Sequence, residues 1–165
     1  MKKYAIVNVK NSKFFFSLII FATFFLSGCW SSKTEDSKLV VINVLDAANH
    51  EDCHMTGSIN IPFESLEDQM KSLNKKDRYV LYCSNYACSA APFAASMMKE
   101  AGFENVRFFH GGIADWYQKG LPCTGKAQME YLKEENEPLS EDGHPGAINI
   151  SLDELKSEMA LAKMF

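Results

Sequence analysis

The sequence predicts an α/β fold in which a parallel central sheet is flanked by helices on both faces. Residues 39–44 form an apolar, β-branched run, which is typical of a strand buried on both of its faces. Stretches with apolar residues at helical spacing alternate with such runs along the chain. The connections are short, and strands that alternate with helices through short loops form parallel sheets. The 165 residues suffice for one such domain.

The elements are expected in a regular order after residue 38. The expected strands are residues 39–44, 79–82 and 106–109, with a short apolar–polar alternation at 58–62. The expected helices are residues 63–72, 90–101 and 113–119. Three residues mark helix ends: Ser89 as an N-cap, and Gly102 and Gly120 as C-terminal stops.

A cysteine loop lies between the second of these strands and the helix that follows it. Cys83 directly follows the strand, and small and polar residues separate it from the helix. A thiol reacts as its thiolate, and backbone N–H groups of a tight loop and a first helical turn favour that anion. Ligands of parallel sheets bind beyond the carboxyl ends of the strands. We therefore expect Cys83 to be ionised at a reactive site; the alternative is a buried structural cysteine.

The N-terminus predicts export from the cell. Four lysines precede an almost wholly apolar run at residues 14–26, which is typical of a signal peptide and short for a membrane span. Residues 26–29, Leu-Ser-Gly-Cys, resemble the lipobox of bacterial lipoproteins. This resemblance implies lipidation of Cys29 and a cell-envelope location, anchored to a membrane and facing the periplasm. Because Trp30 is not aspartate, the outer membrane is favoured in a Gram-negative cell.

Removal of the signal would leave an acidic protein. The chain carries 17 basic and 21 acidic residues; without the four signal lysines, 13 basic residues remain and the formal charge is −8. This charge disfavours nucleic acid and anionic lipid as partners. The expected membrane attachment is therefore the lipid on Cys29 alone.

Four cysteines remain beyond the lipobox, and their spacing does not match a regular disulfide framework. They are Cys53, Cys83, Cys88 and Cys123. His50, Cys53 and His54 lack the separated second pair of a zinc site, so no metal is expected. His54 and His110 are interpreted as structural residues in preference to general bases or ligands.

Three segments, in order, resemble the rhodanese-like (sulfurtransferase) domain family. Residues 53–62, Cys-His-Met-Thr-Gly-Ser-Ile-Asn-Ile-Pro, are similar to the family's Gly-His-Ile-Pro-Gly-Ala-Ile-Asn-Ile-Pro. Tyr82-Cys83 together with Ser89-Ala90 matches the active-site loop, and residues 101–106 leading to 111–116 match the closing segment. The resemblance covers residues 39–125.

The resemblance implies a sulfurtransferase that needs no cofactor. Cys83 is the expected nucleophile, which takes sulfur from thiosulfate, polysulfide or a persulfide and passes it to a thiol or cyanide. The backbone of the loop is expected to bind the persulfide and the leaving group. The loop consists of Ser84, Asn85, Tyr86, Ala87, Cys88 and Ser89.

The loop departs from the family pattern because it contains no arginine or lysine. Without a guanidinium fork, weak thiosulfate turnover is expected. Cys88 suggests an alternative function, a thiol–disulfide redox protein that uses Cys83 and Cys88. A further alternative is a catalytically weak rhodanese-like binding module. A loop-type phosphatase is excluded, since Ser89 stands where that chemistry needs arginine.

The predicted organisation has four parts. These are a signal peptide at 1–28, a flexible tether at 29–37, a rhodanese-like domain at 38–125 and a C-terminal tail at 126–165. In the tail, residues 143–152 resemble the segment that begins at Cys53, so the tail is interpreted as a truncated second repeat. A monomer is expected.

Overall fold

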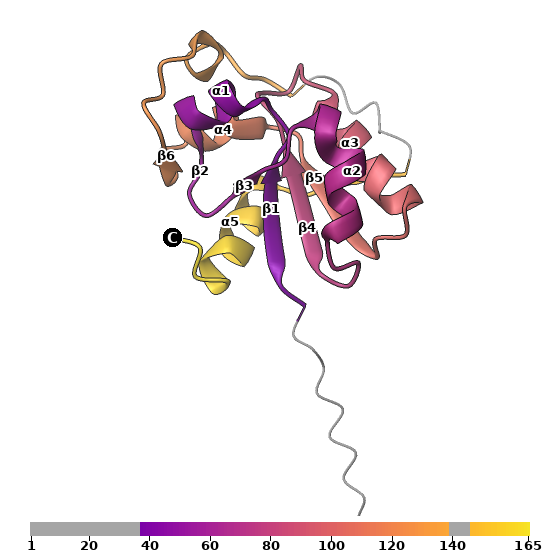
Figure 1. Cartoon of the computed structure of the whole chain (residues 1–165). Helices are drawn as coiled ribbons and strands as arrows, with labels where there is room; N and C mark the ends of the chain where they lie inside the picture. Colours follow the sequence, from indigo (N-terminus) through magenta and orange to yellow (C-terminus); the bar gives the residue numbers. More distant parts are fainter. Residues whose placement is uncertain (1–36, 139–145) are drawn as a thin grey trace, which may run out of the picture. The chain divides into compact units, whose positions relative to one another are not determined.

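The computed structural model describes residues 37–138 and 146–165, which fall within one compact unit. Its centre is a five-stranded sheet with the order β3-β1-β4-β5-β7, in which every neighbouring pair is parallel (Figure 1). The strands are β1 Leu39–Asn43, β3 Ile59–Asn60, β4 Arg78–Tyr82, β5 Asn105–Phe109 and β7 Ile148–Asn149. The predicted α/β fold with a parallel central sheet is confirmed.

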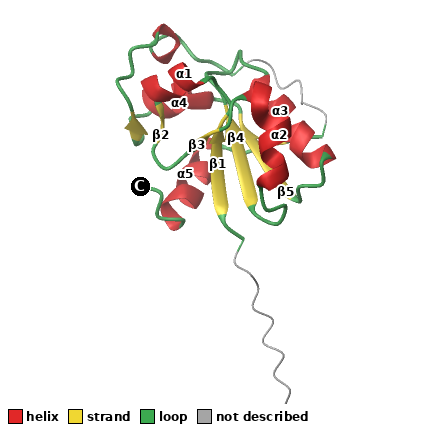
Figure 2. Cartoon of the chain, viewed as in Figure 1, coloured by secondary structure: helices red, strands yellow, loops and turns green. Residues whose placement is uncertain are grey.

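Helices cover both faces of this sheet (Figure 2). On one face, α2 (Leu66–Gln69) and α3 (Ala90–Glu100) pack against the strands. On the other face lie α4 (Gly112–Gln118) and α5 (Leu152–Leu161). Successive residues of a strand point to opposite faces, so Val41 joins one apolar cluster and Ile42 the other. Each face therefore has its own buried core.

The expected helix at residues 63–72 is broken into three short turns. They are the 3-10 turn Phe63–Ser65, α2, and the 3-10 turn Met70–Ser72. Serine hydroxyls compete for backbone carbonyls here: Ser65 Oγ donates to Pro62 O at 3.0 Å and Ser72 Oγ to Gln69 O at 2.8 Å. Such local bonds favour turns over a continuous helix.

A second, antiparallel sheet lies beside the main one and was not expected from the sequence. It pairs β2 (His54–Met55) with β6 (Cys123–Thr124). A short helix, α1 (Ala47–Asp52), leads into β2, and Asp46 caps it by accepting a hydrogen bond from Asn49 N. These strands have two residues each, too few to show a period in the sequence.

The C-terminal segment completes the main sheet. β7 pairs with β5, and the buried residues Ile150, Leu155 and Met159 pack into the α4 face. Strand β3, which lies in the segment that the tail resembles in sequence, forms the opposite edge of the sheet. Residues 139–145, which include part of the predicted repeat, lie outside the described residues.

The predicted signal peptide, Cys29 and nearly all of the predicted tether, residues 29–36, also lie outside the described residues. Among the residues that are described, no helix combines the length and the apolar character needed to cross a membrane.

Candidate functional site

Cys83 lies at the carboxyl end of β4, the middle strand of the sheet. The chain turns directly after it, and the loop that follows is held by the start of α4. Ile113 N donates to Cys83 O and Ala114 N donates to Ser84 O, each at 2.9 Å. This contact needs a glycine, because a Cβ on Gly112 would lie 2.5 Å from the backbone carbon of Ser84.

The loop from Ser84 to Ser89 connects this strand end to α3. Inside it, Cys88 N donates to Asn85 O at 3.1 Å and forms a tight turn. Ser89 occupies the N-cap position of α3, as expected, but its side chain makes no capping hydrogen bond. The first turn of α3 is instead closed through the backbone, where Phe93 N donates to Ser89 O.

The Cys83 thiol is fully buried at the bottom of the loop. It donates a hydrogen bond to the carbonyl oxygen of Cys88 at 3.1 Å. Hydrogen bonding to the Cys88 thiol and burial raise the pKa of Cys83, while the amides of Ala91 and Ser84 favour its thiolate. The sequence predicts an ionised Cys83; the structure differs, because a carbonyl and a second thiol also face the sulfur and favour its protonated form.

The half-buried Cys88 thiol is the more readily ionised of the two. A hydrogen bond from Cys83 lowers the pKa of Cys88 to about 5, with further contributions from the Ala90 and Ser84 amides. The two cysteines are free and form no disulfide. Two thiols that interact this strongly titrate as a pair, so at neutral pH the pair holds one proton and one negative charge.

A residue from the C-terminal part of the chain fixes the loop from outside. Asn136 Oδ1 accepts a hydrogen bond from Tyr86 N at 3.1 Å, and its Nδ2 donates to Gly111 O at 3.0 Å. Asn136 thus connects the cysteine loop to the turn before α4. Sequence reasoning missed it, since it lies 50 residues from Tyr86 in a segment with no recognisable motif.

One acidic side chain contacts the rim of the loop. Tyr86 Oη donates to Asp115 Oδ2 at 3.5 Å, and burial raises the pKa of Asp115. The Tyr86 ring also meets the His110 ring edge-on, with centroids 5.3 Å apart. No basic side chain belongs to the loop itself.

The histidines singled out in the sequence make structural contacts. His54 Nδ1 lies 2.7 Å from His50 O, and the two rings are stacked with centroids 4.0 Å apart. Asn149 Oδ1 accepts from His110 N, which joins β5 to β7. Across residues 37–138 and 146–165, no three His, Cys, Asp or Glu side chains are grouped as metal ligands would be.

The comparisons with known proteins show the family of this chain. Residues 30–119 match the family model described as "Rhodanese-like domain". The chain belongs to the rhodanese-like domain family. This match covers more than half of the chain and includes the whole cysteine loop.

Two curated relatives share the rhodanese-like region. The chain is 30% identical over 97 residues to the HTH-type transcriptional regulator Rv0324 of Mycobacterium tuberculosis, covering 59% of this chain and 42% of that protein. It is 26% identical over 120 residues to the tRNA uridine(34) hydroxylase of Erwinia tasmaniensis, covering 66% and 33%. The rhodanese-like chain thus spans less than half the length of either relative.

Solved structures show the same fold. The BH2092 protein from Bacillus halodurans has a TM-score of 0.50 and 32% identity, over 54% of this chain and 65% of that one. The rhodanese-like domain of the Alr3790 protein from Anabaena, solved in solution, has a TM-score of 0.50 and 25% identity, over 64% and 80%.

Proposed function

We propose that this rhodanese-like domain is a sulfurtransferase that carries sulfane sulfur as a persulfide on Cys83. The observation that supports the proposal best is the paired thiol at the end of β4. Cys83 has two backbone amides that favour its thiolate and a neighbouring thiolate that can take its proton. A nucleophile and its base are therefore already in contact.

The reaction begins when the Cys83 proton passes to the Cys88 sulfur. The Cys83 thiolate then attacks the outer sulfur of a sulfane donor, a new S–S bond forms, and the donor's own S–S bond breaks. The leaving group departs with that electron pair: sulfite from thiosulfate, or a shorter thiolate from a polysulfide or persulfide. An acceptor thiolate or cyanide then attacks the outer sulfur of the persulfide and restores the Cys83 thiolate.

The rim indicates which donor is preferred. Thiosulfate is a dianion, and recognition of such a group usually relies on arginine or lysine. This loop offers neither, and Asp115 lies against Tyr86 at 3.5 Å. We therefore propose a donor with less negative charge, an organic polysulfide or a persulfide, in preference to thiosulfate, with a thiol as acceptor.

Intact mass spectrometry tests the proposal. The sample is the full chain with Cys29→Ser, treated separately with polysulfide and with thiosulfate. We expect one added sulfur atom, more complete with polysulfide, that is absent in Cys83→Ser and that still forms, but more slowly, in Cys88→Ser. No added sulfur under either treatment would contradict sulfur transfer and favour the binding module.

A second candidate function is thiol–disulfide exchange by Cys83 and Cys88. The contact between the two thiols favours it, together with the pKa of about 5 that Cys88 acquires. After sulfur loading, Cys88 could attack the inner sulfur of the persulfide and form a Cys83–Cys88 disulfide while hydrosulfide leaves. A loss of two hydrogen atoms that requires both cysteines, with a sulfur-loaded species that is transient and does not accumulate, would support this redox function over transfer.

We also propose that the protein is an exported, monomeric lipoprotein attached through Cys29. The basic start, the apolar run and the lipobox-like residues 26–29 support this. Detergent-phase partitioning of the full chain expressed in bacteria tests it, with Cys29→Ser as the control. We expect the wild-type chain in the detergent phase and the variant in the aqueous phase; wild-type protein in the aqueous phase would contradict the anchor.

A further inference from the structure

A second pair of cysteines lies in the small sheet, outside the sulfur-transfer site. Cys53 comes directly before β2 with extended backbone, and Cys123 is the first residue of β6. The antiparallel register pairs Met55 with Cys123, so Cys53 is the diagonal neighbour of Cys123 on the same face. Both belong to the apolar cluster under α4.

The two thiols are neighbours on the same face of the small sheet and interact across it. A thiol–thiol hydrogen bond raises the pKa of Cys53 and lowers that of Cys123. Both cysteines are free, and their accessibility differs: Cys53 is fully buried, whereas Cys123 is half-buried. An oxidant from solution therefore meets Cys123 first, and Cys53 is positioned to react second.

We propose that Cys53 and Cys123 form a disulfide bond when the protein meets a small disulfide oxidant. The Cys123 thiolate attacks one sulfur of the oxidant, whose S–S bond breaks and releases one thiolate. Cys53 then attacks the Cys123 sulfur of this mixed disulfide, its proton goes to the departing second thiolate, and the Cys53–Cys123 bond forms. The protein loses two electrons and two protons, and the oxidant becomes two thiols.

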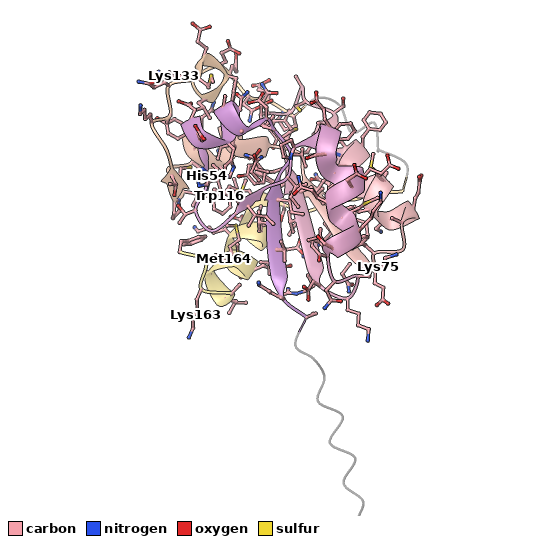
Figure 3. The ribbon with its side chains drawn as sticks, in the orientation of Figure 1. His54, Lys75, Trp116, Lys133, Lys163 and Met164 are labelled. Atoms are coloured by element: carbon pink, nitrogen blue, oxygen red, sulfur yellow. The ribbon has the colours of Figure 1, made fainter. Side chains whose placement is uncertain are left out.

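The position of this bond gives it a structural role. It would join β2 to β6 next to two hydrogen bonds that connect this sheet to the main domain. Tyr82 Oη, directly before Cys83, accepts from Met55 N at 3.0 Å. Trp116 Nε1 in α4 donates to Pro122 O at 3.0 Å. Figure 3 shows His54 of β2 and Trp116 of α4 on the same side of the domain. A covalent link here would therefore stabilise the side of the domain that supports the end of β4.

The same region holds the segment that leads to Asn136. Ala127 N donates to Asp52 O at 2.8 Å, and the Asp52 carboxylate accepts from Gln128 N and Met129 N. Asp52 is the neighbour of Cys53. Oxidation would thus fix α1, β6 and the start of this segment together.

The test uses the full chain with Cys29→Ser, Cys83→Ser and Cys88→Ser, so that one cysteine pair remains. After incubation of the native protein with oxidised glutathione, we expect a mass lower by two hydrogen atoms and one non-reduced peptide pair that joins Cys53 to Cys123. We also expect the melting midpoint to rise by roughly 10 °C, reversed by a thiol reductant, because the bond closes a long loop.

Two further variants in that background serve as controls. Cys53→Ala should keep a glutathione adduct on Cys123, and Cys123→Ser should leave Cys53 unmodified in the native state. The proposal is overturned if glutathione adducts accumulate on both cysteines without a cross-link. It is equally overturned if the cross-link forms only after denaturation. A far-ultraviolet spectrum of the starting protein shows whether the protein was folded when the oxidant was added.

Discussion

At the scale of single residues, the main feature is one proton shared by Cys83 and Cys88. Cys83, whose pKa is raised, is buried, whereas Cys88, whose pKa is lowered, is partly accessible. Sulfur chemistry at Cys83 then depends on the base next to it as well as on backbone amides.

We predict that Cys88→Ser raises the pH at which the cysteine loop first ionises. In the wild-type chain the pair should lose its first proton near pH 5, since that is the pKa of Cys88. A serine hydroxyl stays neutral at these pH values, so Cys83 alone should ionise only above neutral pH. Ultraviolet thiolate absorbance against pH measures this in a background without Cys53 and Cys123; equal titration of both proteins would contradict the shared proton.

Asn136 is predicted to be a positioning residue for the loop. Asn136→Ala removes two hydrogen bonds, worth about 1 kcal/mol each, one to Tyr86 N and one to Gly111 O. We expect faster hydrogen exchange at residues 84–88 and faster alkylation of the loop cysteines, with little change elsewhere. Asn136→Asp, which keeps the acceptor for Tyr86 N but lacks the donor, should give an intermediate effect.

At the scale of elements, the start of α4 depends on close backbone approach. Gly112 has a φ of +63° and a Cβ there would meet the Ser84 backbone, whereas Gly120 has a φ of +66° and open space around it. The two glycines share a conformation and differ only in their surroundings.

This difference gives a matched pair of variants. Gly120→Ala should cost about 1 kcal/mol of unfolding free energy from backbone strain alone. Gly112→Ala should cost several-fold more, because strain and a backbone clash add, and it should also abolish sulfur loading of Cys83. Denaturant unfolding and intact mass measure the two effects; equal losses in both variants would show that the close approach is unimportant.

Helix α5 is attached to the sheet by ion pairs as well as by its apolar face. Glu158 Oε2 accepts from Arg78 Nη1 at 3.0 Å and from Arg107 Nη2 at 2.7 Å. The hydrogen bond from Arg107 lowers the pKa of Glu158. The carboxylate therefore stabilises the fold above its unfolded pKa, and this contribution is lost as the pH falls through the lowered folded value.

Glu158→Gln is predicted to lower the unfolding free energy by about 1–3 kcal/mol at neutral pH. The difference from wild type should shrink in acid, where the wild-type carboxylate is protonated. Glu154→Gln is the control, since Glu154 makes a single ion pair within the described residues, with Arg107, and is more exposed. Thermal melts at several pH values measure this, and a loss that persists in acid would argue against the ionic origin.

At the scale of the whole molecule, the C-terminal segment is part of the domain core. The fully buried Leu155 lies in the same apolar cluster as Trp116 and Val80. Leu155→Ala should cost about 2–5 kcal/mol, a large part of the stability of a domain this size. Leu161→Ala, at an 81% exposed position, should cost little; similar melting midpoints for the two variants would show that α5 contributes little to the core.

Sequence patterns predicted the strands and helices whose apolar residues follow a clear period, such as β1, β4 and α3. They also predicted that Cys83 would lie at a strand end, because a parallel sheet places such ends together. They did not predict β2, β6 or Asn136, since each depends on pairing between segments far apart in the chain. The ionisation of Cys83 could not be inferred either, because it depends on where the Cys88 carbonyl and thiol point.

The two outer strands of the sheet, β3 and β7, consist of two residues each. An edge this short presents few unpaired backbone groups to the edge of a neighbouring copy. Sheet-to-sheet polymerisation is thereby discouraged, even where many copies are crowded on one surface.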